Sequence, residues 1–318
     1  MTNGEYIHEI HAARGRIAPH IRRTALERNR TLSELAGTNV YLKLELFQPT
    51  GSFKVRGAFN KLLGSDLAGV PGVIAVSGGN HAQAVAYAAT KLGVRSVILM
   101  PRSTPSNYLD ATRGYGAEID LTENIGEAFA RLSEYTSKGW TLVHPFDDPV
   151  VIAGQGTTGL EIMEQAPQTT DIFASIGGGG LVSGIAMAGK SARADVRVWG
   201  VETEGADAMA RALAAGEVYQ MPAITSIART LGAPAVTPRT LDLARRLLEQ
   251  VFVVPDDTAI AGMKILMERA KLVVEPATGC VVGALLREKA RFGPADHVVV
   301  VVCGGNVGLR ELAGWLAR

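Results

Sequence analysis

Cysteine is scarce in this 318-residue chain, which contains only Cys280 and Cys303. Two cysteines cannot form a disulfide framework, and no His or Cys residues stand near them at the spacing of metal ligands. The sequence therefore argues against a disulfide-stabilised scaffold and against a zinc site. Each cysteine is predicted to be a small buried residue.

An excess of charge of one sign is also missing, as are long hydrophobic runs. The 32 basic and 31 acidic residues are interspersed and leave a formal net charge of +1, so no basic face is available for nucleic acid or anionic membranes. No stretch approaches the roughly 20 apolar residues of a membrane span, and residues 1–9 do not resemble a signal peptide. We expect a cytoplasmic protein that binds neither nucleic acid nor membranes.

Short runs of β-branched residues alternate with amphipathic segments along the chain, which predicts an α/β fold with mostly parallel sheets covered by helices on both faces. The predicted buried strands are 40–46, 73–76, 97–100, 172–176, 196–201, 251–254 and 298–302. The predicted helices include 80–92, 125–137, 156–165, 258–272, 281–291 and 309–316. The length favours two modest cores, with a division near residues 144–154.

Glycine is abundant and clustered, with pairs at 78–79 and 304–305 and four in a row at Gly177–Gly180. The four glycines follow a predicted strand and precede a helix expected to start at Leu181. Their backbone amides can bind an anion at the positive end of the helix dipole. We predict a phosphate site here, and a tight strand-to-helix turn is the alternative.

The phosphate could belong to a dinucleotide, because Glu202 ends the next strand where a Rossmann protein places its ribose-binding acid. The spacing of the glycines argues against this hypothesis, since the third glycine of a G-x-G-x-x-G motif would fall on Ser183. A non-catalytic nucleotide-binding protein therefore remains only as an alternative.

A second loop, Ser77-Gly78-Gly79-Asn80-His81, also follows a buried strand and opens a helix. Its amides and the Asn80 side chain should meet at the carboxyl edge of the sheet, where a second anion such as a substrate carboxylate can bind. His81 is predicted to pack at the start of the helix in preference to transferring protons, because the helix dipole disfavours an imidazolium there.

Lys54 lies between glycines in the segment 49–58, beside Phe53 and just before a predicted helix. A lysine is usually a solvated surface residue. Here Arg56 stands two residues away, and we expect this cation, together with partial burial, to lower the pKa of the Lys54 amine, as a Schiff-base nucleophile requires.

The segment 53–57 resembles the Schiff-base motif of fold-type II pyridoxal-phosphate enzymes, in the branch of threonine and serine dehydratases and serine racemases. The resemblance extends over nearly the whole chain and agrees in the order of its motifs, which are 77–81, 144–146, 153–157, 177–180, 275–276 and 303–306. A short threonine dehydratase without a regulatory domain is the most similar type, because only one helix is expected after Asn306.

This resemblance implies a fold like that of the tryptophan synthase β-subunit, with two open twisted sheets. It implies a large pyridoxal 5′-phosphate domain of residues 1–48 and 150–318, with residues 49–149 inserted as a small domain. The active site would lie in the cleft between the two domains. A homodimer is the implied assembly, and a small amino acid is the implied partner.

The resemblance also implies roles for individual residues. Lys54 would hold the cofactor as a Schiff base, Phe53 would lie against its ring, Asn80 would bond its phenolic oxygen, and Cys303 would lie near its pyridine nitrogen. A neutral thiol there favours elimination. The other implied cofactor contacts are Gly177, Gly178, Gly179, Gly180, Leu181 and Glu275. The implied substrate contacts are Ser77, Gly78, Gly79, Asn80 and His81, with Arg229 as a further candidate.

The implied reaction converts a 3-hydroxy amino acid of the threonine or serine type to a 2-oxo acid and ammonia, with Lys54 removing the α-proton. Racemases of this branch carry a serine where this chain has Gly78, so serine racemisation should be weak. Arg229 replaces an acidic residue of the relatives, which suggests an anionic substrate such as 3-hydroxyaspartate unless this arginine is simply solvated. Phenylserine is a further candidate.

Two other expectations follow from departures from the family pattern. The relatives bind a divalent cation through a glutamate and an aspartate six residues later, but here Glu202 is followed at that spacing by Ala208, and Asp207 is one residue out of place. We therefore expect no firm metal site, with Mg²⁺ or Ca²⁺ possible if the loop adjusts. A β-replacement enzyme such as a cysteine synthase is disfavoured, because those relatives have a different sequence around the lysine.

Overall fold

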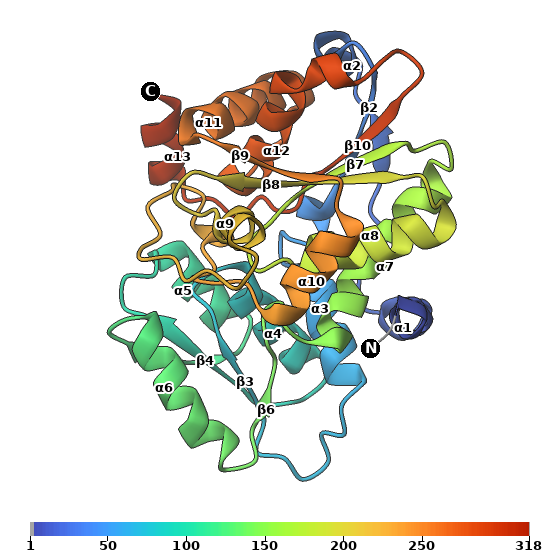
Figure 1. Ribbon diagram of the computed structural model, residues 1–318. Coiled ribbons are helices and arrows are strands. Elements are labelled where there is room, and N and C mark those ends of the chain that lie inside the picture. The colour runs from blue at the N-terminus through green and yellow to red at the C-terminus, as the bar shows by residue number, and fades with distance from the viewer. Residues whose placement is uncertain (1–2, 318) are drawn as a thin grey trace.

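The chain folds around two separate β-sheets, and the computed structural model describes residues 3–317 (Figure 1). The larger sheet is parallel except at one edge, and its strands in spatial order are β1 (Leu26–Arg28), β2 (Asn39–Lys43), β10 (His297–Val301), β7 (Asp171–Ser175), β8 (Arg197–Thr203) and β9 (Gln250–Val254). Only β1 runs antiparallel to its neighbour.

The smaller sheet is parallel throughout and is built from a continuous part of the chain. Its strands in spatial order are β5 (Glu118–Thr122), β4 (Ser96–Pro101), β3 (Val73–Val76) and β6 (Thr141–Leu142). Because parallel strands need crossover connections, helices separate the strands of both sheets. We propose residues 1–48 with 150–318, and residues 49–149, as the two domains. The membership of the two sheets supports this division.

Thirteen α-helices are found within residues 3–317. In the first half of the chain they are α1 (Asn3–Ile17), α2 (Arg30–Ala36), α3 (Lys54–Leu63), α4 (Asn80–Lys91), α5 (Ser106–Gly114), α6 (Ile125–Thr136) and α7 (Pro149–Gln165). In the second half they are α8 (Gly180–Ala192), α9 (Ala208–Ala215), α10 (Pro238–Leu247), α11 (Asp256–Ile265), α12 (Pro276–Arg287) and α13 (Leu309–Leu316).

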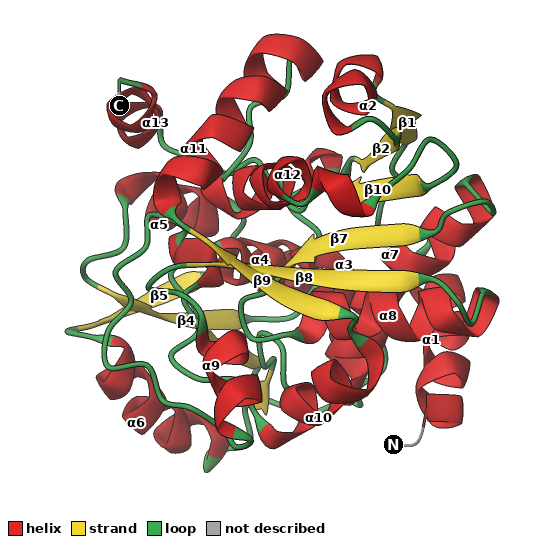
Figure 2. Cartoon of the chain, turned by 45° about the horizontal axis from the view of Figure 1, so that its top comes forward, coloured by secondary structure: helices red, strands yellow, loops and turns green. Residues whose placement is uncertain are grey.

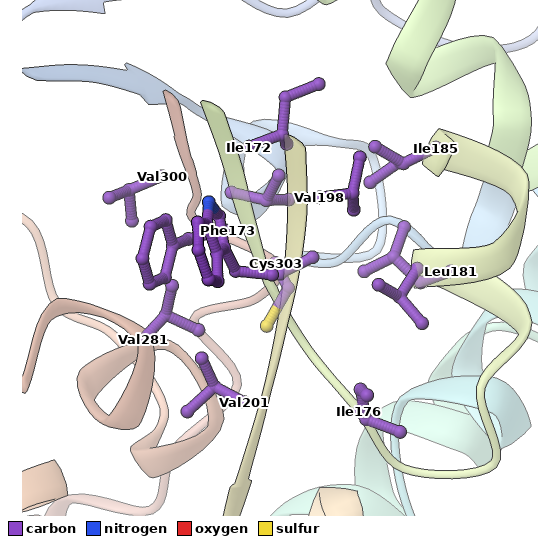
Figure 3. Packing of buried hydrophobic residues seen from close by; sticks show 14 of the residues in the cluster. Ile172, Phe173, Ile176, Leu181, Ile185, Val198, Val201, Val281, Val300 and Cys303 are labelled. Atoms are coloured by element: carbon purple, nitrogen blue, oxygen red, sulfur yellow. The ribbon is translucent and has the colours of Figure 1, made fainter. Parts of the chain in front are cut away.

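Helices cover both faces of the larger sheet, with α11 and α12 on one side and α7 and α8 on the other (Figures 1 and 2). In the close-up of this core, Ile172 lies with Val198 and Ile185 on one face, and Phe173 lies with Val281 and Val300 on the other (Figure 3). Apolar side chains on both faces explain the nearly continuous hydrophobic strands of the sequence. The predicted fold class is therefore confirmed.

Every predicted strand is present within a few residues of its expected bounds, but some helices begin earlier than the periodicity suggested. The helix predicted at 156–165 begins at Pro149, because the Asp148 side chain caps it by accepting bonds from the Val150 and Val151 amides. The helix predicted at 281–291 begins at Pro276 and ends at Arg287. Proline suits the first helical position, where its missing N–H is not needed.

In the part of the chain that the structure describes, no helix combines the length and apolar character needed to traverse a bilayer.

Candidate active site

A single cavity of about 630 Å³ collects the loops that follow strands of both sheets. Such a volume lies in the usual range for small-molecule sites. All the site residues predicted from the sequence line it, and they are Phe53, Lys54, Ser77, Gly78, Gly79, Asn80, His81, Gly177, Gly178, Gly179, Gly180, Leu181, Arg229, Glu275 and Cys303. Loops after parallel strands meet at the carboxyl edge of a sheet, so their convergence follows from the topology.

Lys54 is the first residue of α3, and its amine is held inside the cavity. The Nζ atom donates a hydrogen bond of 2.8 Å to the carbonyl oxygen of Pro145, which lies between β6 and α7. The ring centroid of Phe53 is 5.1 Å from the same nitrogen. The amine is therefore positioned by the backbone and by an aromatic face, and no carboxylate contacts it in these bonds.

Burial lowers the pKa of the Lys54 amine to about 8. The expected contribution of Arg56 was wrong, because its guanidinium faces away into a buried ionic cluster. It lies 2.7 Å from Glu45 and 2.7 Å from Glu161, and Lys43 approaches Glu161 at 2.6 Å. Two cations and two anions balance there, so the cluster anchors α3 without adding net charge beneath Lys54.

The glycine loop 177–180 ends at the N-terminus of α8, whose first N–H groups lack helical acceptors. Two of its glycines also have local reasons to be glycine. A Cβ at Gly178 would lie 2.1 Å from the Phe146 ring, and Gly179 has a φ of 94°. Close packing and unpaired amides therefore coexist in this loop, and the amides can receive a phosphate.

The loop 77–81 has the same construction at the start of α4. The Gly79 amide donates to the Ser77 hydroxyl at 3.2 Å, which tightens the turn between β3 and the helix. The N–H groups of the first helical turn again have no acceptor within the helix. This loop can receive a second anion, such as the carboxylate of an amino acid.

His81 is buried against the small sheet and has little capacity to carry a proton. Its Nε2 lies 2.8 Å from the Val143 carbonyl oxygen, so this nitrogen carries the hydrogen and donates it. Burial, followed by the charge of Lys54, lowers the pKa of His81 to about 3. The imidazole is therefore neutral, in agreement with the packing role predicted for it.

Glu275 is the centre of a buried hydrogen-bond network. Its carboxylate accepts bonds from Asn80 Nδ2 at 2.9 and 3.0 Å, from Thr230 Oγ1 at 2.9 Å and from the Asn306 amide at 3.0 Å. Asn306 Nδ2 in turn donates to Asn80 Oδ1 at 2.8 Å. These bonds fix which end of the Asn80 side chain is oxygen and which is nitrogen, and they join the start of α4 to the larger sheet.

Burial raises the pKa of the Glu275 carboxyl above its usual range, although the bonds from Asn80, Thr230 and Asn306 oppose that shift. The network therefore stabilises a carboxylate that burial alone would destabilise.

Cys303 lies two residues beyond the end of β10, with its sulfur 3.4 Å from Ser175 Oγ and 3.3 Å from Thr278 Oγ1. Burial raises the pKa of its thiol to about 11. A protonated thiol beside two hydroxyl groups is a neutral partner for whatever lies above it.

Glu202 is outside the residues that line the cavity, although it ends β8 as predicted. Its carboxyl oxygens accept bonds from the Met209 and Ala210 amides at 2.9 and 2.8 Å, at the start of α9. Because this acid caps α9, it does not bind a ribose in the cavity with Gly177–Gly180. Between residues 3 and 317, no three His, Cys, Asp or Glu side chains gather as a metal site requires.

Sequence reasoning gave no role to three polar residues of the site. Asn306 and Thr230 bond Glu275, and Thr104 stands beside Gly78, where a Cβ would lie 2.8 Å from its hydroxyl oxygen. Asn306 follows two glycines after a strand, which is the same signal that drew attention to Asn80. Thr104 carries no comparable local signal.

The residues of the cavity fit pyridoxal phosphate by the chemistry of their donors. An amine of lowered pKa, an amide loop for a phosphate, an asparagine with a fixed orientation and a neutral thiol meet in one enclosed space. Fold and site thus define an α/β enzyme that works through a lysine and a phosphate-bearing cofactor.

Comparison with known proteins agrees with this definition. The family model described as pyridoxal-phosphate dependent enzyme matches residues 17–304. An L-threonine ammonia-lyase of Geobacter sulfurreducens is 38% identical over 307 residues, which are 96% of this chain and 76% of that protein. The chain belongs to the family of pyridoxal-phosphate dependent enzymes, as the Lys54 motif predicted.

Solved structures give the same result. A maize serine racemase superposes with a TM-score of 0.90 at 34% identity and covers 98% of this chain and 96% of its own. A threonine deaminase from the organism abbreviated T.th. superposes with a TM-score of 0.88 at 38% identity, covering 95% of this chain and 99% of its own. The predicted fold type and cofactor are confirmed, and the nucleotide-binding alternative is set aside.

Proposed function

We propose that this enzyme eliminates the β-hydroxyl of a 3-hydroxy amino acid, and that the dehydrated product hydrolyses to a 2-oxo acid and ammonia. The observation that carries the proposal is the Lys54 amine, which lies in one cavity with two loops able to hold anions. One loop suits a cofactor phosphate and the other suits a substrate carboxylate. The threonine ammonia-lyase and threonine deaminase relatives support the same reaction class.

When bound, the cofactor supplies a sink for the electron pair left by the breaking α-C–H bond. The residues of the chain provide positioning and proton transfer. The amides of 177–180 hold the phosphate, Asn80 meets the phenolic oxygen, and Ser77 with the amides before Asn80 holds the substrate carboxylate. The Nζ of Lys54 takes the α-proton as general base, and its pKa near 8 leaves a useful neutral fraction at physiological pH.

The thiol of Cys303 suits elimination better than reactions that need a long-lived carbanion. Its pKa near 11 keeps it neutral, so it does not stabilise a proton on the pyridine nitrogen as a carboxylate would. Because the β-hydroxyl leaves early in an elimination, a moderate electron sink is sufficient.

Serine racemase is the second candidate, because a maize serine racemase is among the similar structures. Racemisation needs a proton donor on the face opposite Lys54. Gly78 has no side chain to supply that proton, so we propose racemisation as a slow side reaction at most.

The test is release of 2-oxo acid across a panel of 3-hydroxy amino acids of both configurations, with the Lys54→Ala variant as control. Product from at least one substrate, absent in the variant, supports the proposal. Product from none, with cofactor bound and the protein folded, would exclude it. Interconversion of serine enantiomers as fast as deamination would favour the racemase.

A homodimer and a cytoplasmic location stay predictions from the sequence. Light scattering coupled to size-exclusion chromatography measures the first, and fractionation of cells that produce the protein measures the second.

A further inference from the structure

The helix α6 presents two large apolar side chains to the active-site cavity. Ile125 is 40% exposed and Phe129 is 43% exposed, and they stand one helical turn apart. The side chains of α6 that pack against the small sheet are others, namely Ala128, Leu132 and Tyr135. Ile125 and Phe129 are therefore not needed to hold α6 in place.

Two further segments bring apolar side chains to the same cavity. Ile224 and Ile227 come from the loop between α9 and α10, and Val307 and Trp315 come from the C-terminal part of the chain. These four are partly exposed, so they keep apolar surface free toward the cavity. Three segments far apart in the sequence thus supply the same kind of surface.

The charged groups of this part of the cavity compensate each other. Arg229 Nη1 lies 3.6 Å from Glu311 Oε1, and both residues line the cavity. An arginine already facing a carboxylate gains little from a second anion, because the second carboxylate would be repelled by the first. The pair therefore does not favour an acidic substrate side chain, which leaves the apolar surface as the main recognition feature.

We infer that Ile125, Phe129, Ile224, Ile227, Val307 and Trp315 form a subsite for an apolar substrate side chain that is larger than the methyl group of threonine. The substrate class would be 3-hydroxy amino acids with an aromatic or branched aliphatic side chain, such as phenylserine or 3-hydroxyleucine. This inference rests on the proposed dehydratase function. Burial of the side chain against these residues is what would select the substrate.

The first measurement compares kcat/KM for phenylserine, 3-hydroxyleucine, threonine, serine and 3-hydroxyaspartate. We expect the two bulky apolar substrates to exceed threonine by roughly tenfold or more, since one extra methylene group in an apolar pocket already gives about tenfold. Phe129→Ala should remove roughly tenfold for phenylserine and leave threonine nearly unchanged. Phe47→Ala is the matched control, because Phe47 is 48% exposed and lies outside the cavity.

The second measurement does not depend on turnover. Phenylalanine and alanine carry the same two kinds of side chain without the leaving hydroxyl, and calorimetry gives their Kd for the holoenzyme. We expect phenylalanine to bind roughly tenfold more tightly than alanine, and Phe129→Ala to abolish the difference. Phe129 is partly exposed, so this variant should fold.

Three results would overturn the inference. Higher kcat/KM for threonine, serine or 3-hydroxyaspartate than for both bulky substrates would leave the dehydratase standing and remove the subsite. An equal loss for every substrate in Phe129→Ala would show that the residue helps to close the cavity and does not select the side chain. Equal Kd values for phenylalanine and alanine would also overturn it. If no substrate yields a 2-oxo acid, the proposed function fails, and these Kd values still test the subsite.

Discussion

The inner and outer parts of the cavity are held in different ways. Around Glu275 the inner part is a buried network in which each bond fixes the next, from Thr230 through the carboxylate to Asn80 and Asn306. The outer part, lined by Ile125 and Phe129, is apolar. Its one ion pair, between Arg229 and Glu311, spans 3.6 Å.

The difference separates two tasks. Buried polar groups tolerate little change, because an unpaired donor or acceptor loses about 1–3 kcal/mol. Apolar surface is non-directional and can change shape without leaving a group unsatisfied. The reaction geometry is therefore set by the inner part, and the choice of substrate side chain can be altered in the outer part. Substitutions should divide along the same line.

The largest effect is expected for Lys54→Ala in the inner part. Loss of the general base should reduce 2-oxo acid formation by roughly 10²–10⁴-fold. Lys61→Ala is the matched control, because Lys61 lies in the same helix but pairs with Asp148 at 2.7 Å. Activity of the Lys54 variant near that of the control would contradict the assignment of the base.

The pH dependence of cofactor uptake should report the burial of the same amine. Only the neutral amine attacks an aldehyde, and the pKa of Lys54 is lowered to about 8. The neutral fraction rises with pH up to the pKa, so the rate at which apoenzyme takes up pyridoxal phosphate should rise about tenfold per pH unit below that value and level off above it. Absorbance of the Schiff base follows the rate. A rise that continues toward pH 10 would mean an ordinary lysine.

Glu275→Ala tests whether the inner network orients Asn80. The variant leaves the Asn80 amide, the Thr230 hydroxyl and the Asn306 amide without their acceptor, so the apparent Kd for the cofactor should rise about tenfold, equivalent to about 1.4 kcal/mol. Equilibrium dialysis measures it. Glu275→Gln keeps one acceptor oxygen and should fall between the variant and the unaltered enzyme. An unchanged Kd in a folded Ala variant would detach Asn80 from the network.

Gly78→Ser tests the boundary between the two parts. The new Cβ would lie 2.8 Å from Thr104 Oγ1, so the threonine must move, and the free energy of unfolding should drop by about 1 kcal/mol. Serine racemisation should stay slow because Thr104 crowds the new hydroxyl. Denaturant unfolding and chiral chromatography measure both quantities. The double variant with Thr104→Ala should regain the stability, and failure to do so would locate the strain elsewhere.

The smallest effect is expected for Arg229→Ala in the outer part. The arginine is 67% exposed in its pair with Glu311, so its removal should change the free energy of unfolding by no more than about 0.5 kcal/mol. The ratio of kcat/KM for 3-hydroxyaspartate to that for threonine should not change. A selective loss for 3-hydroxyaspartate would instead establish the acidic substrate that this arginine first suggested.

Local signals predicted much of the fold. Runs such as Val73–Val76 and Val298–Val302 mark strands buried on both faces, whereas β1, β5 and β6 went unpredicted. β1 and β5 are edge strands, and β6 has only two residues. Short or half-exposed strands carry little hydrophobic signal, which is why the sequence does not reveal them.

The sequence by itself determined the family, the lysine and the two loops that can hold anions, because each depends on residues adjacent in the chain. Only the tertiary structure decided how these parts act together. Asn80 and Asn306 are 226 positions apart and share a hydrogen bond, and burial in the cavity, not the neighbouring Arg56, lowers the pKa of Lys54. Burial and long-range pairing are properties of the folded chain, so no local pattern encodes them.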